Sequence, residues 1–131
     1  MHFEYYYMII GIGCDTVDHD LTKDLDWGSD AKTLQRFFTR KELDLYNKNK
    51  AIRFLAGRFA AKEVLLKCLG TGICDGLSFT DIQILQLEDG RPIIEIWGEV
   101  RANADRLGVA KWHISITHAL NSSMAFVIAE S

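Results

Sequence analysis

The chain has 131 residues, 48% hydrophobic and 25% charged, a composition typical of one soluble globular domain with no room for a second. Its net charge of −3 and its lack of a nucleic-acid-binding motif argue against nucleic acid as a partner, and the apolar run Met8–Cys14 is too short to span a membrane. Three cysteines (Cys14, Cys68 and Cys74) without a Cys-x-x-Cys pair indicate free thiols in a reducing compartment, so we expect a cytoplasmic protein.

The first predicted element is a strand over Met8–Cys14, in which apolar residues alternate with Gly11 and Gly13. Glycine in a strand often marks the close approach of another backbone or of a ligand. We place Asp15 at the end of this strand, where its carboxylate could project into a cleft or cap the next segment. Residues 1–8 are interpreted as an N-terminal extension or the start of this strand, and residues 9–131 as a single domain.

Two short helices are predicted next. Ser29 and Asp30 form a plausible helix start, and Thr39 and Glu42 have the spacing of a capping box. The surrounding segment, residues 31–70, holds ten Lys or Arg and only three Asp or Glu. Such a positive segment suits a phosphate-bearing polyanion or an acidic partner protein.

The chain is organised around Phe54–Gly72, which reads FLAGRFAAKEVLLKCLGTG. On helical geometry this stretch is apolar on two opposite sides, so we expect a central, buried helix. It nevertheless carries Glu63, and a buried carboxylate is costly unless it is paired or holds a cation. An ion pair with Lys67, one turn later, and a bound metal would both satisfy Glu63, and periodicity alone leaves the two alternatives open.

The remaining pattern predicts a hairpin, a surface helix ended by a glycine, and a second pair of strands. Their ranges are Leu77–Ile96, Glu99–Leu107 with Gly108, and Lys111–Thr117 with Ser123–Ala129. This order predicts an α+β fold in which helices gather against a mostly antiparallel sheet.

Four stretches, in order, resemble the holo-acyl-carrier-protein synthases, the short members of the 4′-phosphopantetheinyl transferases. They are GIGCD at 11–15, AGRFAAKE at 56–63 with Lys67 and GTG at 70–72, LSFTDIQI at 77–84, and ISITH at 114–118. The similarity spans residue 9 to about residue 129 and is weakest between residues 17 and 35. It implies the 4′-phosphopantetheinyl transferase fold, with the sheet packed on the long central helix. It also implies a homotrimer with each active site between two subunits.

The resemblance implies transfer of 4′-phosphopantetheine from coenzyme A to a serine of apo acyl carrier protein, with release of adenosine 3′,5′-bisphosphate. Mg²⁺ is the implied cofactor, because a hard cation offsets phosphate charge through oxygen ligands. Asp15 and Glu63 match the family's two magnesium carboxylates. With them, Lys67 completes the implied catalytic set by neutralising the pyrophosphate, and Glu63 could also help deprotonate the attacking serine.

The resemblance also implies residues that bind coenzyme A. Arg58 lies about 140° from Glu63 around the helix, so the two cannot serve one site within a subunit, whereas a trimer could bring Arg58 to a neighbouring site. The residues assigned to binding are Lys50, Arg53, Arg58, Lys67, Gly70, Thr71, Ser115, Thr117 and His118.

One segment departs from the family pattern. Family members usually carry arginines that dock on the acidic carrier after the first Asp, but Asp15–Asp30 holds six Asp and a single Lys. Docking could shift to Lys32, Arg36, Arg40 and Lys41, or the carrier could be less acidic on that face.

Two other functions remain as alternatives. A non-catalytic coenzyme A or carrier-binding module of the same fold is disfavoured because both metal carboxylates are present. A divalent-metal pyrophosphatase that cleaves coenzyme A with water is disfavoured because its expected cluster of glutamates is missing.

Overall fold

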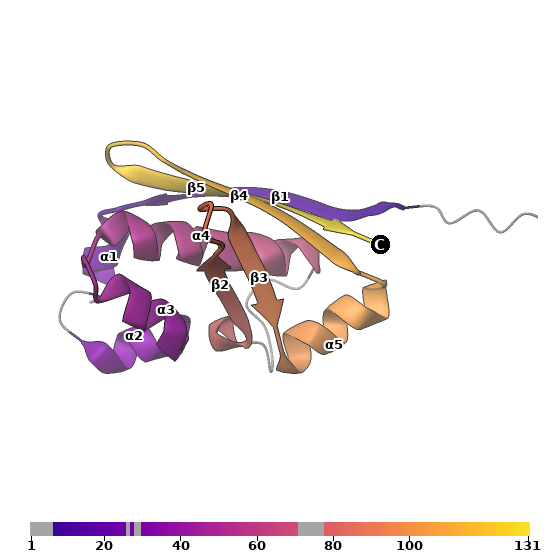
Figure 1. The fold of residues 1–131 in the computed structure, drawn as a ribbon, viewed down its shortest axis with the longest axis horizontal. Coiled ribbons are helices and arrows are strands. Elements are labelled where there is room, and N and C mark those ends of the chain that lie inside the picture. The colour runs from indigo at the N-terminus through magenta and orange to yellow at the C-terminus, as the bar shows by residue number, and fades with distance from the viewer. Residues whose placement is uncertain (1–6, 26, 28–29, 71–77) are drawn as a thin grey trace, which may run out of the picture.

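The computed structural model describes residues 7–25, 27, 30–70 and 78–131 (Figure 1). The elements, in chain order, are β1 (Ile9–Asp18), α1 (Leu21–Asp24), α2 (Ala31–Phe37), α3 (Arg40–Tyr46), α4 (Ile52–Cys68), the 3-10 helix η1 (Phe79–Asp81), β2 (Ile82–Gln86), β3 (Pro92–Ile96), α5 (Gly98–Leu107), β4 (Lys111–His118) and β5 (Ser122–Glu130). Within the described ranges, no helix is both long and apolar enough to cross a membrane.

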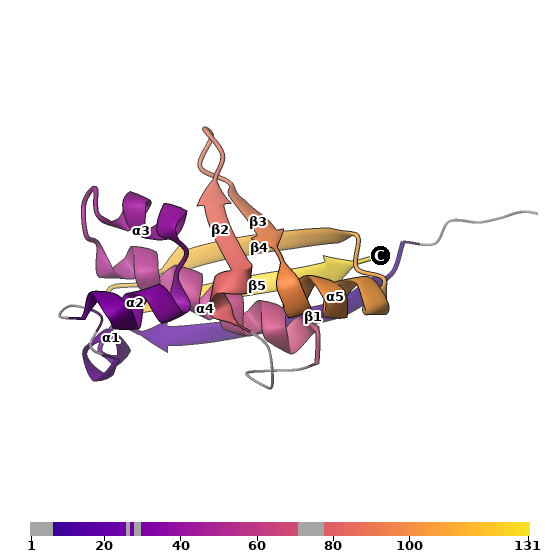
Figure 2. The same cartoon turned by 90° about the horizontal axis from the view of Figure 1, so that it is seen from below.

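The strands form two antiparallel sheets. β5 is the middle strand of a three-stranded sheet of order β1-β5-β4, and β2 pairs only with β3 in a hairpin. Seen from below, the hairpin runs across the strands of the larger sheet (Figure 2). The predicted α+β class with antiparallel strands is therefore confirmed, and the structure adds that the strands divide between two sheets.

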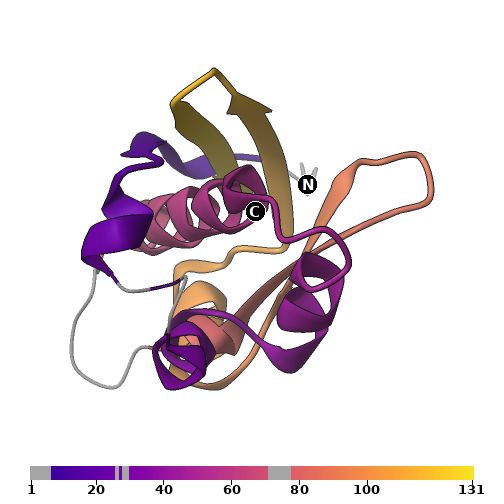
Figure 3. The same cartoon turned by 90° about the vertical axis from the view of Figure 1, so that its left-hand side faces the viewer.

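Helix α4 lies between the three-stranded sheet on one side and α2 and α3 on the other (Figure 3). Twelve of its 17 residues are buried, as expected for a helix that is apolar on two sides. It begins two residues earlier than predicted and ends at Cys68, and Gly70 follows with a left-handed φ of 73°. The helix therefore has no solvent-exposed face along most of its length.

Strand β1 packs unusually close to α4 because two glycines face the helix. A Cβ at Gly11 would lie 2.4 Å from the carbonyl oxygen of Cys68, and one at Gly13 would lie 2.9 Å from Val64 Cγ1. The predicted close approach is confirmed, but the predicted position of Asp15 at the strand end is wrong. β1 continues to Asp18, so Asp15 lies inside the strand, opposite Ala125. Aspartates are poor strand formers, and pairing with β5 overrides that preference.

The predicted helix caps are confirmed, and the predicted hairpin is present as Ile82–Gln86 and Pro92–Ile96, whereas Phe79–Asp81 of its predicted range form η1 and Leu77 lies outside the described residues. The Thr39 side chain accepts a hydrogen bond from the backbone of Glu42, and the Glu42 side chain accepts one from the backbone of Thr39. Asp30 caps α2 by accepting from the backbone N–H of Lys32, whereas Ser29 lies outside the described residues. Gly108 ends α5 with a left-handed φ of 81°.

The charge at the centre of the molecule belongs to Lys62. Lys62 and Glu42 are each fully buried, and the Lys62 Nζ lies 2.6 Å from Glu42 Oε1. The ammonium also donates to the carbonyl oxygens of Phe37 at 2.7 Å and of Phe79 at 3.1 Å. Its three N–H groups are thus all used, which is the condition under which a buried charge is tolerated.

The Glu42 carboxylate is satisfied from its other side. Its Oε1 accepts from the backbone N–H of Thr39 at 2.8 Å, and its Oε2 accepts from the backbone N–H of Ile84 at 2.9 Å. Burial lowers the pKa of Lys62 to about 8, and Glu42 opposes that shift. The pair joins α2, α3, α4, η1 and β2 at one point.

An aromatic cluster surrounds this pair beneath α4. Phe59 of α4 lies 5.2 Å from Trp27, 5.5 Å from Phe37 and 5.4 Å from Phe79, measured between ring centroids. Phe38 completes the cluster, with its ring 5.2 Å from Trp27. The apolar shell excludes water from the ion pair, which strengthens the pair and raises the cost of breaking it.

We expect Lys62→Met to lower the free energy of unfolding by about 3–5 kcal/mol, because Glu42 would stay buried without its cation. The double variant Lys62→Met/Glu42→Gln should lose less free energy of unfolding, since it leaves no uncompensated charge buried. Urea unfolding followed by circular dichroism measures both. Lys41→Met, on the exposed surface of α3, is the matched control and should change stability by no more than about 0.5 kcal/mol. Equal stabilities of the Lys62 and Lys41 variants would contradict this account.

Candidate functional site

Three predicted residues meet where β1 crosses α4, and we call Asp15, Glu63 and Lys67 the carboxylate half-site. Asp15 faces α4 from β1, on the same side as Gly13, and is half-buried. Glu63 and Lys67 lie one turn apart on α4. The Lys67 Nζ is 3.6 Å from Asp15 Oδ2. Among the described residues, the ion pair that Lys67 forms within 4.0 Å is therefore with Asp15 and not with Glu63.

The half-site concentrates negative charge in a partly desolvated position. Burial raises the pKa of Glu63, the neighbouring charge of Asp15 raises it further, and Lys67 opposes both effects. Two carboxylates that disfavour each other's charge are stabilised by a cation between them, and carboxylate oxygens are ligands that Mg²⁺ prefers. Within the described ranges, no group of three or more His, Cys, Asp or Glu could hold a metal. Asp15 and Glu63 thus fit a Mg²⁺ that takes its other ligands from water or from a substrate.

A second cluster lies on the other side of α4, and we call Arg53, Arg58 and His118 the basic half-site. Arg58 is 5% exposed. Its Nε donates to the carbonyl oxygen of Ile84 at 2.9 Å, and its guanidinium lies 3.5 Å from the centre of the Phe54 ring. Its Nη2 is buried and has no hydrogen-bond partner among the described residues. Burial lowers the pKa of Arg58 to about 10, against the influence of Glu42.

Arg58, which carries this unpartnered nitrogen, lines a small cavity. The cavity has a volume of about 90 Å³, and its lining is Arg58, Ile84, Gln86, Gly90, Pro92, Ile116 and His118. A buried N–H without a partner is costly, so an anion seated beside this arginine would be stabilised by a charge-assisted hydrogen bond.

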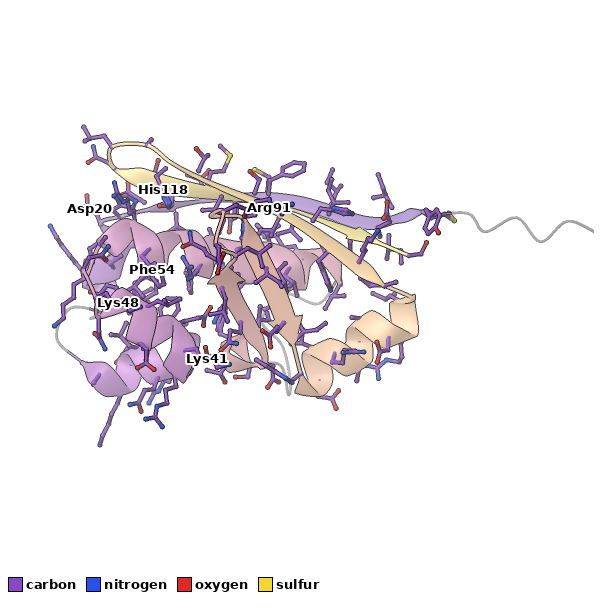
Figure 4. All side chains as sticks on the ribbon, viewed as in Figure 1. Asp20, Lys41, Lys48, Phe54, Arg91 and His118 are labelled. Atoms are coloured by element: carbon purple, nitrogen blue, oxygen red, sulfur yellow. The ribbon has the colours of Figure 1, made fainter. Side chains whose placement is uncertain are left out.

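His118 lies at the end of β4, above the N-terminal half of α4 (Figure 4). Gly57 makes this position possible, because a Cβ there would lie 2.8 Å from Ile116 Cγ2 and 2.9 Å from His118 Cε1. Burial lowers the pKa of His118, and the charges of Arg53, His19 and Arg58 lower it further. The ring therefore sits in positive surroundings that an anion would offset.

The other predicted binding residues are more scattered. Lys50, with a left-handed φ of 52°, is exposed just before α4. Ser115 and Thr117 point to the open face of the three-stranded sheet, because they alternate along β4 with residues that face α4. Gly70 follows the end of α4, and Thr71 lies outside the described residues. Among the described residues of this set, Lys50, Gly70, Ser115 and Thr117 do not line the small cavity that Arg58 and His118 share.

The two half-sites are separated by the width of α4. The carboxylate half-site lies beside β1, which is one edge of the sheet, whereas the basic half-site lies beside β4, which is the opposite edge. Arg58 and Glu63 thus point to opposite sides of the helix, as their spacing predicts. Chemistry that needs both half-sites would need a second copy of the chain.

Sequence reasoning gave no role to Ser123, which contacts His118, or to His19, which contacts Ser123. The Ser123 Oγ lies 2.7 Å from His118 Nδ1 and 2.9 Å from His19 Nε2. His19 and Ser123 are 104 positions apart in the chain, so no local pattern could reveal the contact. In the sequence, Ser123 is simply the first residue of a predicted strand, and nothing marks it as functional.

Comparisons with known proteins identify the family of the chain. Residues 11–125 match the 4′-phosphopantetheinyl transferase superfamily. The chain is 41% identical over 126 residues to the holo-[acyl-carrier-protein] synthase of Listeria monocytogenes serotype 4a, which covers 94% of this chain and 99% of the relative. It is 38% identical over 125 residues to the corresponding protein of Hydrogenovibrio crunogenus, covering 95% of this chain and 98% of the relative.

Solved structures show the same fold. The holo-[acyl-carrier-protein] synthase of Neisseria meningitidis aligns with a TM-score of 0.85 at 30% identity, covering 95% of this chain and all of that one. The Bacillus anthracis protein, solved in complex with coenzyme A (3′,5′-ADP), aligns with a TM-score of 0.78 at 32% identity, covering 95% of this chain and 98% of that one. The resemblance found in the sequence motifs is thus confirmed: the chain belongs to the holo-[acyl-carrier-protein] synthase family of the 4′-phosphopantetheinyl transferase superfamily.

Proposed function

We propose that this chain transfers 4′-phosphopantetheine from coenzyme A to a serine of apo acyl carrier protein, releasing adenosine 3′,5′-bisphosphate. The observation that carries the proposal is the carboxylate half-site. Asp15 and Glu63 come from two of the motifs shared with the family and lie on different elements, close enough for the charge of Asp15 to raise the pKa of Glu63, and Lys67 of the same helix forms an ion pair with Asp15.

In this reaction the serine hydroxyl attacks the pyrophosphate phosphorus next to pantetheine, and the bond from that phosphorus to the leaving bisphosphate breaks. A Mg²⁺ held by Asp15 and Glu63 would supply positive charge that stabilises the pyrophosphate oxygens. Lys67, with its side chain 53% exposed, can reach the same oxygens and donate to them. Glu63 is placed to accept the serine proton, directly or through a water.

The basic half-site supplies the nucleotide end of the proposed site. The buried Arg58, whose Nη2 has no hydrogen-bond partner among the described residues, lines the cavity together with His118. Arg53 and Lys50 are exposed at the start of α4, where they can add positive charge around a 3′-phosphate. The coenzyme A complex of the Bacillus anthracis relative supports coenzyme A as the substrate.

The separation of the half-sites supports a homotrimer in which each site lies between two copies. The open face of the three-stranded sheet carries exposed apolar side chains, with Ile12 59% exposed and Met124 and Phe126 each 39% exposed. An exposed apolar strip on a sheet is typical of a surface that another copy covers. Ser115 and Thr117 lie on this face opposite Phe126 and Met124, so a neighbouring copy could use them at its own site.

The surface near the proposed carrier site has an acidic part and a basic part. Asp20 and Asp24 of the first helical segment are exposed, and so are the basic residues of α2 and α3. We therefore assign carrier docking to the α2 and α3 surface, through Lys32, Arg36, Arg40 and Lys41. The cytoplasmic location stays a prediction from the sequence.

We expect intact-mass spectrometry to show the gain of one phosphopantetheine by an apo acyl carrier protein incubated with this protein, coenzyme A and Mg²⁺. Glu63→Gln and a chelator should each reduce the rate by at least about 100-fold, because each removes charge stabilisation of the transition state. Glu95→Gln, an exposed carboxylate on β3, is the matched control and should keep full activity. Binding of coenzyme A without any transfer to a panel of acidic and less acidic carriers would instead favour the non-catalytic binding module.

We also expect two impaired variants to complement each other when they are assayed at a coenzyme A concentration well below KM. Glu63→Gln damages the carboxylate half-site and His118→Ala damages the basic one. When the two are refolded together in equal amounts, random pairing should return about a quarter of the wild-type rate, since one intact site needs one half from each variant. The transfer assay measures the recovery, and each variant refolded alone is the control. A mixture no more active than its components would show that the site does not lie between copies.

A further inference from the structure

A single buried hydroxyl lies between two histidines at the edge of the basic half-site. Ser123 is 1% exposed, and its Oγ is within hydrogen-bond distance of His118 Nδ1 and of His19 Nε2. The backbone holds His19 in place, since its N–H donates to Asn121 at 2.8 Å and its carbonyl oxygen accepts from the Thr22 hydroxyl at 2.7 Å. The three side chains thus come from three places: the segment after β1, the end of β4 and the start of β5.

The proton count of this network limits the states of the two rings. A serine hydroxyl has one hydrogen to donate, so between two neutral imidazoles one ring accepts from Ser123 and the other must donate to it. If Ser123 donates to His118 Nδ1, the hydrogen of His118 sits on Nε2, and His19 donates from its own Nε2. In the reverse arrangement His118 Nε2 has only a lone pair, which repels an anion.

Binding of an anion by a neutral His118 needs the first arrangement. Arg53 and Arg58 face the ring from α4, and His19 faces it from the segment after β1. The charges of Arg53 and Arg58 disfavour a charged His118, so the neutral ring has to provide the N–H that an anion needs. It does so only when the hydrogen is on Nε2.

We propose that Ser123 and His19 are positioning residues for His118. The hydroxyl that the two rings share turns Nδ1 of His118 into the fold and keeps the hydrogen on Nε2, the ring nitrogen left available to an anion. The inference rests on the proposed function, in which that anion is a phosphate on the adenosine part of coenzyme A. Neither residue touches the reacting phosphorus.

The test separates positioning from simple packing by means of three variants. Ser123→Ala removes the shared hydroxyl, and His19→Leu removes the second ring. His19→Gln retains an N–H donor at a similar distance from the backbone and is the rescue variant. His19 is only half-buried, so its variants keep the test available if Ser123→Ala does not fold.

The first readout is the ¹⁵N signal pattern of the His118 ring in the ligand-free protein, identified by its loss in His118→Ala. We expect the wild type and His19→Gln to show hydrogen on Nε2, and Ser123→Ala and His19→Leu to show a mixture of tautomers. The second readout is binding of adenosine 3′,5′-bisphosphate by calorimetry. Loss of the fixed N–H should weaken it about two- to tenfold in the latter two variants, with KM for coenzyme A rising and kcat nearly unchanged.

Three results would overturn the inference. They are a wild-type ring with hydrogen on Nδ1, a Ser123→Ala ring with the wild-type pattern, and a changed tautomer without a change in affinity. Failure of the proposed function looks different. In that case the ligand-free tautomers would follow the expected order, while the wild type neither bound the bisphosphate nor transferred phosphopantetheine.

Discussion

The buried pair of Lys62 and Glu42 is the constraint on which the arrangement of the site depends. Lys62 lies on α4 between Arg58 and Glu63, and its ammonium donates hydrogen bonds to groups on α2, α3 and η1. Turning the helix by one residue would rotate it by about 100° and carry the charge out of this pocket. The pair therefore fixes which side of α4 faces β1 and which faces β4. The positions of the carboxylate and basic half-sites follow from that orientation.

Local signals in the sequence were sufficient for much of the fold. The capping box at Thr39 and Glu42 was recognisable because both partners lie within one turn of the same helix. The burial of α4 followed from its apolar pattern. The same pattern pointed to Glu63 as the costly buried charge, but Glu63 is only half-buried and Lys62 is fully buried. Periodicity shows that a helix is enclosed, yet it does not show which polar side chain will meet partners from elsewhere in the chain.

The residues of the candidate site also fall into those that the sequence revealed and those that it did not. Asp15, Glu63 and Lys67 were found because they belong to motifs that a family shares, and the structure places them together. The end of β1 was missed because its last residues are polar, and only pairing with β5 makes them a strand. Ser123 and His19 were missed because their relation to His118 exists only after three distant segments have met. Non-local contacts of this kind leave no periodic trace in a sequence.

The position of β5 has a consequence for how the chain acquires its structure. β5 is the last strand in sequence order, yet it is the middle strand of the larger sheet and pairs with β1 across a separation of more than 100 residues. Neither β1 nor β4 has a neighbour in that sheet until residues 122–130 have been synthesised. The packing of α4 against the completed sheet, including the glycine-lined side of β1, likewise requires residues 122–130. We therefore expect the three-stranded sheet to form late and in one concerted step. The chain should fold more slowly than a helical bundle of equal size, because distant segments must meet before any of them is stable.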